Sequence, residues 1–183
     1  VQFSSTAAGP VNIQATGTGT ITITGSAAAG STYDLNLANT RVLAASGAIT
    51  LTGNRSGSYF LSSGSTNIGL LAGTGVTSSS SNVVFNFDNY TMNAATAVNT
   101  SGGVTIQSFG SSFASALQMP VTNLSLGSTI SSLTIGKSTN TAAVTLTGTT
   151  NVAGPITVYG GDVYMNGILN STASNMDVKL IAA

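Results

Sequence analysis

The sequence contains very few side chains that can ionise. It has no His, Cys or Trp, and its four basic and four acidic residues make up only 4% of the chain, whereas an average globular domain is about one quarter charged. Without Cys there are no disulfides and no thiolate metal ligands. Acid–base catalysis and metal binding both depend on ionisable groups. We therefore expect no enzymatic activity, no catalytic residues, no cofactor and no metal site.

The charged residues are scattered, and the formal net charge is zero. A nucleic-acid-binding surface needs a basic patch, and an anionic membrane surface attracts the same kind of patch, so we expect neither partner. No apolar run approaches the roughly 20 residues of a membrane-spanning helix, so we expect no membrane insertion. The chain begins at Val1 without a basic or hydrophobic leader segment, which is typical of a mature or trimmed chain. The charged residues are Asp34, Asp88, Asp162, Asp177, Arg41, Arg55, Lys137 and Lys179.

Short segments in which aliphatic and polar residues alternate recur along the whole chain. This period of two predicts half-buried strands, and the Gly and Asn residues between the segments predict turns. No segment of ten or more residues has a helical period, although 113–119 is compatible with one helical turn. The fold class predicted is therefore all-β. The expected strands include 21–24, 33–37, 49–52, 104–106, 124–126, 133–135, 144–147, 156–158, 163–165 and 178–180.

One five-residue unit, Ile/Val-Thr-Ile/Leu-Thr-Gly, occurs at 21–25, 49–53 and 144–148. Self-similarity of short strands at regular spacing indicates a solenoid, in which each coil buries the apolar face of its neighbours. With about 20–25 residues in a coil, the chain would form roughly seven to nine coils of a parallel β-helix. We expect one domain over 1–183, with 76–120 as a less regular excursion within the rod.

An antiparallel β-sandwich is the alternative fold. Gly160–Gly161 and Asn166–Gly167 are sequences that form the tight turns of hairpins. A sandwich usually has longer strands and more aromatic residues than this chain, in which aromatics are 6%. The solenoid is therefore the preferred prediction.

Several strings resemble the repeats of bacterial filamentous haemagglutinin-like exoproteins and the passenger regions of autotransporter adhesins. The resemblance covers most of the chain and is clearest at 11–55 and 121–183. It implies a right-handed parallel β-helix that is secreted or displayed on the bacterial cell surface. The Asn-Pro motifs of that family's secretion module are not evident, so it also implies an interior stretch of a larger exoprotein or a small relative that polymerises. The strings are TITITG at 20–25, AITLTG at 48–53, AVTLTGTTNVAGPITV at 143–158, GDVYMNGIL at 161–169 and DVKLIAA at 177–183.

The candidate ligand-binding residues are Tyr159 and Tyr164, which flank Gly160–Gly161. The apolar faces of two outward tyrosines can stack on sugar rings. They can equally cover the edge of a coil, and the sequence does not separate these two interpretations.

Thr-x-Thr pairs in the repeated unit resemble the threonine rows of solenoid antifreeze proteins. Such a site needs one pair in every successive coil, but the copies begin 28 and then 95 residues apart, at Ile21, Ile49 and Val144. Thr is also a favourable residue on any exposed strand face. We therefore expect the row to be interrupted.

These observations favour a non-enzymatic structural or adhesive β-solenoid, part of a surface adhesin or an extracellular filament. The expected partners are further copies of the chain, arranged end to end or side by side, and host or matrix glycans. The alternative is a binding module for glycan or ice that uses the outward Tyr or Thr faces. A polysaccharide lyase would need acids and bases converging in a groove, whereas we interpret Asp162, Asp177 and Lys179 as solvated surface groups.

Overall fold

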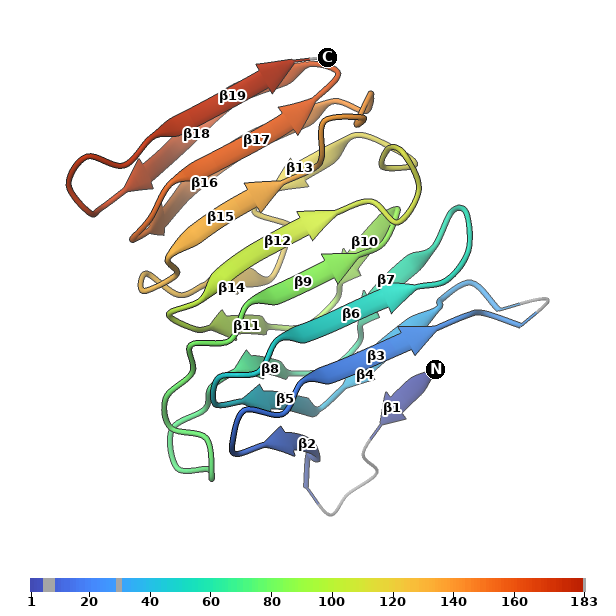
Figure 1. The fold of residues 1–183 in the computed structure, drawn as a ribbon. Helices are drawn as coiled ribbons and strands as arrows, with labels where there is room; N and C mark the ends of the chain where they lie inside the picture. Colours follow the sequence, from blue (N-terminus) through green and yellow to red (C-terminus); the bar gives the residue numbers. More distant parts are fainter. Residues whose placement is uncertain (5–8, 29–30, 183) are drawn as a thin grey trace.

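The computed structural model describes residues 1–4, 9–28 and 31–182, and these ranges contain 19 strands and no helix (Figure 1). Every pair of hydrogen-bonded neighbouring strands in these ranges is parallel. The prediction of an all-β parallel solenoid is confirmed, and the antiparallel sandwich is wrong. Gly160–Gly161 lies where β17 gives way to β18, and Asn166–Gly167 lies inside β18, so neither closes a hairpin.

The strands form four sheets, which we call A to D. Sheet A contains β1 (Gln2–Ser4), β4 (Leu35–Ala38), β7 (Tyr59–Ser62) and β10 (Asn89–Met92). Sheet B contains β2 (Val11–Ala15), β5 (Thr40–Ala44), β8 (Thr66–Gly69), β11 (Thr96–Asn99) and β14 (Leu124–Leu126). Sheet C contains β3 (Ile21–Gly25), β6 (Ile49–Gly53), β9 (Val83–Asn86), β12 (Gly103–Gln107), β15 (Ser132–Ile135), β17 (Ile156–Gly160) and β19 (Val178–Ala182). Sheet D contains β13 (Leu117–Met119), β16 (Val144–Val152) and β18 (Val163–Ser171).

The chain visits the sheets in a repeating order, and one passage through them is one coil. The first four coils each contribute a strand to sheets A, B and C, from β1–β3 to β10–β12. The fifth coil, β13–β15, contributes to sheets D, B and C, and the last two are β16–β17 and β18–β19. The stack thus has seven coils, within the predicted range. Because strands inside each sheet pair with strands of the coils before and after them, their backbone hydrogen bonds are satisfied without charged side chains.

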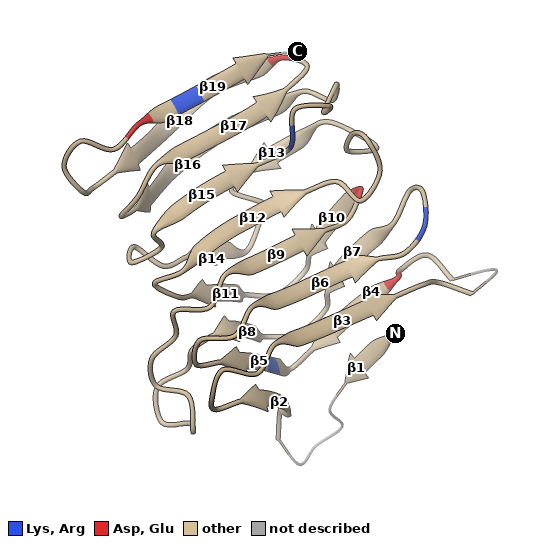
Figure 2. Cartoon of the chain, in the orientation of Figure 1, with Lys and Arg blue, Asp and Glu red and all other residues tan. Residues whose placement is uncertain are grey.

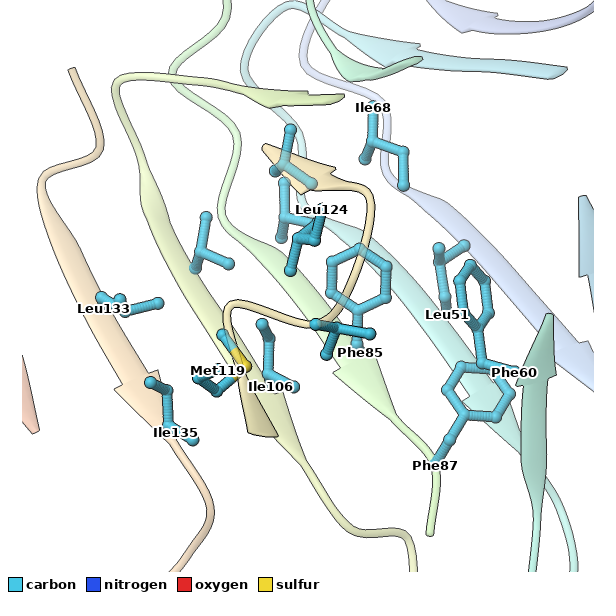
Figure 3. Packing of buried hydrophobic residues seen from close by; sticks show 14 of the residues in the cluster. Leu51, Phe60, Ile68, Phe85, Phe87, Ile106, Met119, Leu124, Leu133 and Ile135 are labelled. Atoms are coloured by element: carbon cyan, nitrogen blue, oxygen red, sulfur yellow. The ribbon is translucent and has the colours of Figure 1, made fainter. Parts of the chain in front are cut away.

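The alternating residues of the predicted strands separate into an interior and an exterior set. In β6, for example, Ile49 and Leu51 are fully buried, whereas Thr50 and Thr52 are partly exposed. The largest buried side chains, Phe60, Phe85 and Phe87, form an aromatic layer in the third coil and at the corner that follows β9 (Figure 3). Aliphatic layers continue on both sides of it.

Polar residues also stack inside the solenoid. Thr40, Thr66 and Thr96 occupy equivalent inward positions on neighbouring strands of sheet B, and each is at most 1% exposed. The Thr96 hydroxyl donates to Ser62 Oγ (2.9 Å), which in turn donates to Thr66 Oγ1 (3.1 Å). All buried side-chain polar atoms of the described residues have hydrogen-bond partners.

The less regular region predicted at 76–120 contains two loops separated by regular strands. Residues 70–82 connect β8 to β9, and 108–116 connect β12 to β13, whereas β9 to β12 keep the coil order. The first loop rejoins the stack beside the end of β5, where the Ser80 amide donates to the Ala45 carbonyl oxygen (2.9 Å). The single helical turn considered for 113–119 does not form. Its last three residues are β13, and they pair with β16.

Candidate functional site

The stack is interrupted on one side between the fourth and fifth coils. On two sides these coils pair directly, through β11 with β14 and β12 with β15. On the third side, sheet A ends at β10 and sheet D begins at β13, and the two strands are not hydrogen-bonded to each other. The loop 108–116 enters here, and its Ala114 amide donates to the Asp88 carbonyl oxygen (2.9 Å).

Two adjoining cavities lie at this interruption, with volumes of about 260 and 330 Å³. They share Tyr90, Val121 and Thr122, so we treat them as one feature and call it the β10 groove. Asn89, Gln118 and Thr122 give the groove polar walls, and Phe113 and Val121 give it an apolar floor. The complete lining is Tyr59, 88–93, Phe113, 115–118 and 121–123.

The corners that precede β4, β7 and β10 carry a buried polar residue in each coil: Asp34, Ser58 and Asp88. The Asp34 side chain is fully buried and accepts three hydrogen bonds, all of 2.8 Å. Its Oδ1 accepts from the Ala27 amide and from Arg55 Nε, and its Oδ2 accepts from the Tyr59 amide. The carboxylate therefore joins three chain segments at one corner.

Two opposing effects act on the pKa of Asp34. Desolvation by burial raises it, but the hydrogen bond from Arg55, the amides of Ala27 and Tyr59 and the charge of Arg55 lower it. The net pKa lies below the ordinary value. Asp34 is thus a charged structural group that the protein stabilises in its ionised form.

Asp88 occupies the corresponding corner two coils further on, where it is 5% exposed and lines the β10 groove. Its Oδ2 accepts from the Gly57 amide (2.7 Å) and its Oδ1 from the Gly110 amide (2.8 Å). In the described ranges the ion pairs are Asp34–Arg55 and Asp177–Lys179, so Asp88 has no cation partner there. One base reaches the loop 108–116: Lys137 Nζ donates to the carbonyl oxygens of Ser108 (3.1 Å) and Phe109 (3.5 Å), and it forms no ion pair with Asp88.

The Tyr90 side chain points into the solenoid. Its hydroxyl donates to the Gln107 carbonyl oxygen (2.6 Å) and accepts from the Phe87 amide (3.2 Å), and its ring packs against Phe60, Phe87 and Phe113. Burial raises the pKa of Tyr90, and the negative charge of Asp88 adds to that shift. Tyr90 therefore supports the floor of the groove as a neutral phenol.

The two tyrosines predicted from the sequence, Tyr159 and Tyr164, lie on different sheets. Tyr159 is on β17 in sheet C and is partly buried, whereas Tyr164 is on β18 in sheet D and is 52% exposed. The Tyr164 hydroxyl lies 3.4 Å from Asp162 Oδ2. Because the chain turns between the two strands, the rings do not form one flat platform.

The row of Thr-x-Thr pairs is interrupted, as expected: Thr24 aligns with Thr52, but Asn86 and Gln107 take that position in the next two coils. Single threonines nevertheless align on the outer face of sheet C. Strand register places one outward residue of each of six coils side by side, and only the third is not Thr. Lys179 follows in the seventh coil. We call this set the threonine row: Thr22, Thr50, Val84, Thr105, Thr134 and Thr157.

The remaining charged groups are dispersed along the stack (Figure 2). Asp177 and Lys179 form an exposed ion pair (3.2 Å), and Asp162 is on the surface near Tyr164. Among the described residues, no group of three or more His, Cys, Asp or Glu could hold a metal ion. None of the described segments is a helix suited to crossing a membrane.

The sequence pointed to the neighbourhood of the groove but not to its residues. The irregular stretch predicted at 76–120 signalled a local change in the rod. The corner carboxylate of Asp88 and the polar wall of Gln118 and Thr122 were missed, because they become one site only through the pairing of coils.

The fold and its outer faces define the class of this protein as a parallel β-solenoid. Comparison with protein-family models, curated proteins and solved structures gave no match.

Proposed function

We propose that this chain is a non-enzymatic structural and adhesive rod, secreted or displayed on the bacterial cell surface as part of an adhesin or an extracellular filament. The observation that carries the proposal is a stack of seven coils joined throughout by sheet C, in a chain rich in hydroxyl and amide groups and nearly free of charge. Such a rod keeps its shape through backbone pairing. Its faces then make many weak contacts, with host or matrix glycans among the partners, and these contacts combine through multivalency.

Self-association is the second part of the proposal. Met165, Val178 and Leu180 belong to the inward set of the last coil, yet each is 43 to 44% exposed. β19 is the last strand of sheet C, and its outer edge offers backbone hydrogen-bonding groups to a strand of another copy. With a net charge of zero, electrostatic repulsion does not oppose contact between copies.

We expect the purified 183-residue chain to assemble in a concentration-dependent manner, giving rods in electron micrographs and a rising sedimentation coefficient. Leu180→Glu places a charge on the exposed apolar surface and should shift the assembly midpoint about tenfold or more to higher concentration. The matched control is Ile181→Glu, the next residue of the same strand, whose side chain faces outward and is 40% exposed. A monomeric parent chain, or equal effects of the two substitutions, would contradict the self-association proposal.

The threonine row favours a second candidate function, an ice-binding module. Equivalent residues of paired strands repeat at about 4.8 Å, so the row presents a regular series of methyl and hydroxyl groups on a flat sheet. Val84 preserves the branched shape of Thr at the one position that lacks the hydroxyl. A regular, uncharged face of this kind can order water in a repeating pattern.

For this second candidate, Thr105→Tyr is the informative substitution because it places a ring in the middle of the row. We expect the parent chain to show thermal hysteresis and Thr105→Tyr to lose most of it. Thr145→Tyr is the control, since Thr145 is also partly exposed on a strand but lies on sheet D. Absence of thermal hysteresis in the parent chain would exclude ice binding and leave the rod function as it stands.

A further inference from the structure

The β10 groove lies between two strand edges that are unpaired within the described residues. β10 is hydrogen-bonded only to β7, and β13 only to β16. At one end of the groove, Asn123 Nδ2 donates to the Met92 carbonyl oxygen (2.7 Å) and closes the gap. At the other end lies Asp88. The groove thus runs along an edge of β10 that pairs with no other strand in the described residues. It lies between the carbonyl oxygens of Asp88 and Met92, which already accept from Ala114 and Asn123.

A free strand edge is matched best by another extended peptide. Main-chain hydrogen bonds to the edge supply affinity, and alternate side chains of the added strand enter pockets on one side. β10 has four residues, which corresponds to about 13 Å of extended chain at 3.3 Å per residue. A segment of three to four residues therefore fits along it.

The contrast between Asp34 and Asp88 indicates which side chain the bound peptide carries. Each carboxylate accepts hydrogen bonds from two backbone amides at a buried corner. Asp34 accepts a further hydrogen bond from Arg55 Nε (2.8 Å). Asp88 has no such ion pair, because Lys137 Nζ donates to the carbonyl oxygens of Ser108 and Phe109 instead, and a cavity of about 260 Å³ lies beside the carboxylate. A hydrogen bond from a cation to a carboxylate is stronger than one between neutral groups.

We propose that the β10 groove binds an extended peptide segment of another protein, with its backbone along β10 and an arginine side chain beside Asp88. The guanidinium takes the place that Arg55 has beside Asp34. A saccharide fits this groove less well, because the ring of Tyr90 is engaged by Phe60, Phe87 and Phe113 and its hydroxyl by backbone groups. This site goes beyond the rod function and does not depend on it.

The test is an NMR titration of the full chain with two blocked pentapeptides, acetyl-Val-Thr-Arg-Thr-Val-amide and the same sequence with citrulline in place of arginine. Citrulline keeps the shape of arginine but is neutral. We expect the arginine peptide to shift the amide signals of Gly57 and Gly110, which donate to Asp88, together with those of Tyr90 and Met92 on β10. The citrulline peptide should bind about tenfold more weakly.

Two substitutions separate the groove from the rest of the surface. Thr122→Trp fills the groove from an exposed position and should abolish the shifts, whereas Thr77→Trp, at an exposed position of the 70–82 loop, should leave them unchanged. Asp88→Asn should bring the two peptides to equal affinity.

Three results would overturn the proposal. They are equal binding of the arginine and citrulline peptides to the parent chain, peptide shifts confined to the terminal strands β1–β3 or β18–β19, and shifts of the groove amides by cellobiose but not by peptide. Because assembly is measured separately by sedimentation, each of these outcomes leaves the rod proposal unaffected.

Discussion

Replacing Phe60 by alanine is expected to lower the free energy of unfolding by about 3–5 kcal/mol, the range for large aromatic residues in a core. Phe60 is fully buried, and its ring centroid lies 5.6 Å from Phe85 and 5.3 Å from Phe87. The β-strands that surround the ring are fixed by pairing on both sides, β7 with β4 and with β10. The cavity left by the ring therefore cannot collapse easily, so we expect the loss of unfolding free energy to lie toward the upper end of this range.

The measurement is a denaturant titration followed by far-UV circular dichroism, with Phe109→Ala as the control. Phe109 belongs to the same aromatic-rich region but is 36% exposed, so its replacement should change the free energy of unfolding by less than about 0.5–1 kcal/mol. Similar values for the two variants would show that the aromatic layer does not hold the third and fourth coils together.

The positions of the strands were predictable from the sequence because alternation is a local property. The segments predicted at 21–24 and 49–52 fall within β3 and β6, and those at 156–158 and 178–180 within β17 and β19. Parallel stacking followed from a physical argument, since short strands with one apolar face can bury it only against their neighbours.

Strand register was not predictable, because the loops that leave the stack have different lengths. Thr50 and Val84 are neighbours in the threonine row although 34 residues separate them, whereas Val84 and Thr105 are neighbours at a separation of 21. A fixed sequence period therefore cannot reveal the row. It becomes continuous only when the hydrogen-bond ladders are known.

The candidate site was hidden for a related reason. Charged residues in a sequence are normally expected on the surface, and nothing local distinguishes the buried Asp34 and Asp88 from the exposed Asp177. Their burial depends on backbone amides that are 22 to 31 residues away for Asp88 and up to 25 for Asp34. The interruption between β10 and β13 is likewise a property of pairing and not of either segment alone.

Asp34→Ala is expected to lower the free energy of unfolding at neutral pH by about 3 kcal/mol. The substitution leaves the partly buried amides of Ala27 and Tyr59 without their acceptor, and each such loss costs about 1–3 kcal/mol when the amide is fully buried. The ion pair itself contributes little, because the Arg55 side chain is 39% exposed and solvent screens its charge. Asp177→Ala is the control, since that carboxylate is 69% exposed and its loss should change stability by less than about 0.5 kcal/mol.

The pH dependence of this stability difference distinguishes the contribution of the Asp34 charge from that of the side chain's size. The folded-state pKa of Asp34 lies below the unfolded value of about 3.9. Its stabilisation is therefore complete above the unfolded pKa and is lost as the pH falls through the folded pKa. Denaturant titrations at pH 7, 5, 3 and 2 should show a difference between the parent chain and Asp34→Ala that is constant down to about pH 5 and then shrinks. A difference that stays the same at pH 2 would mean that the shape of the side chain, and not its ionised carboxylate, holds this corner of the solenoid together.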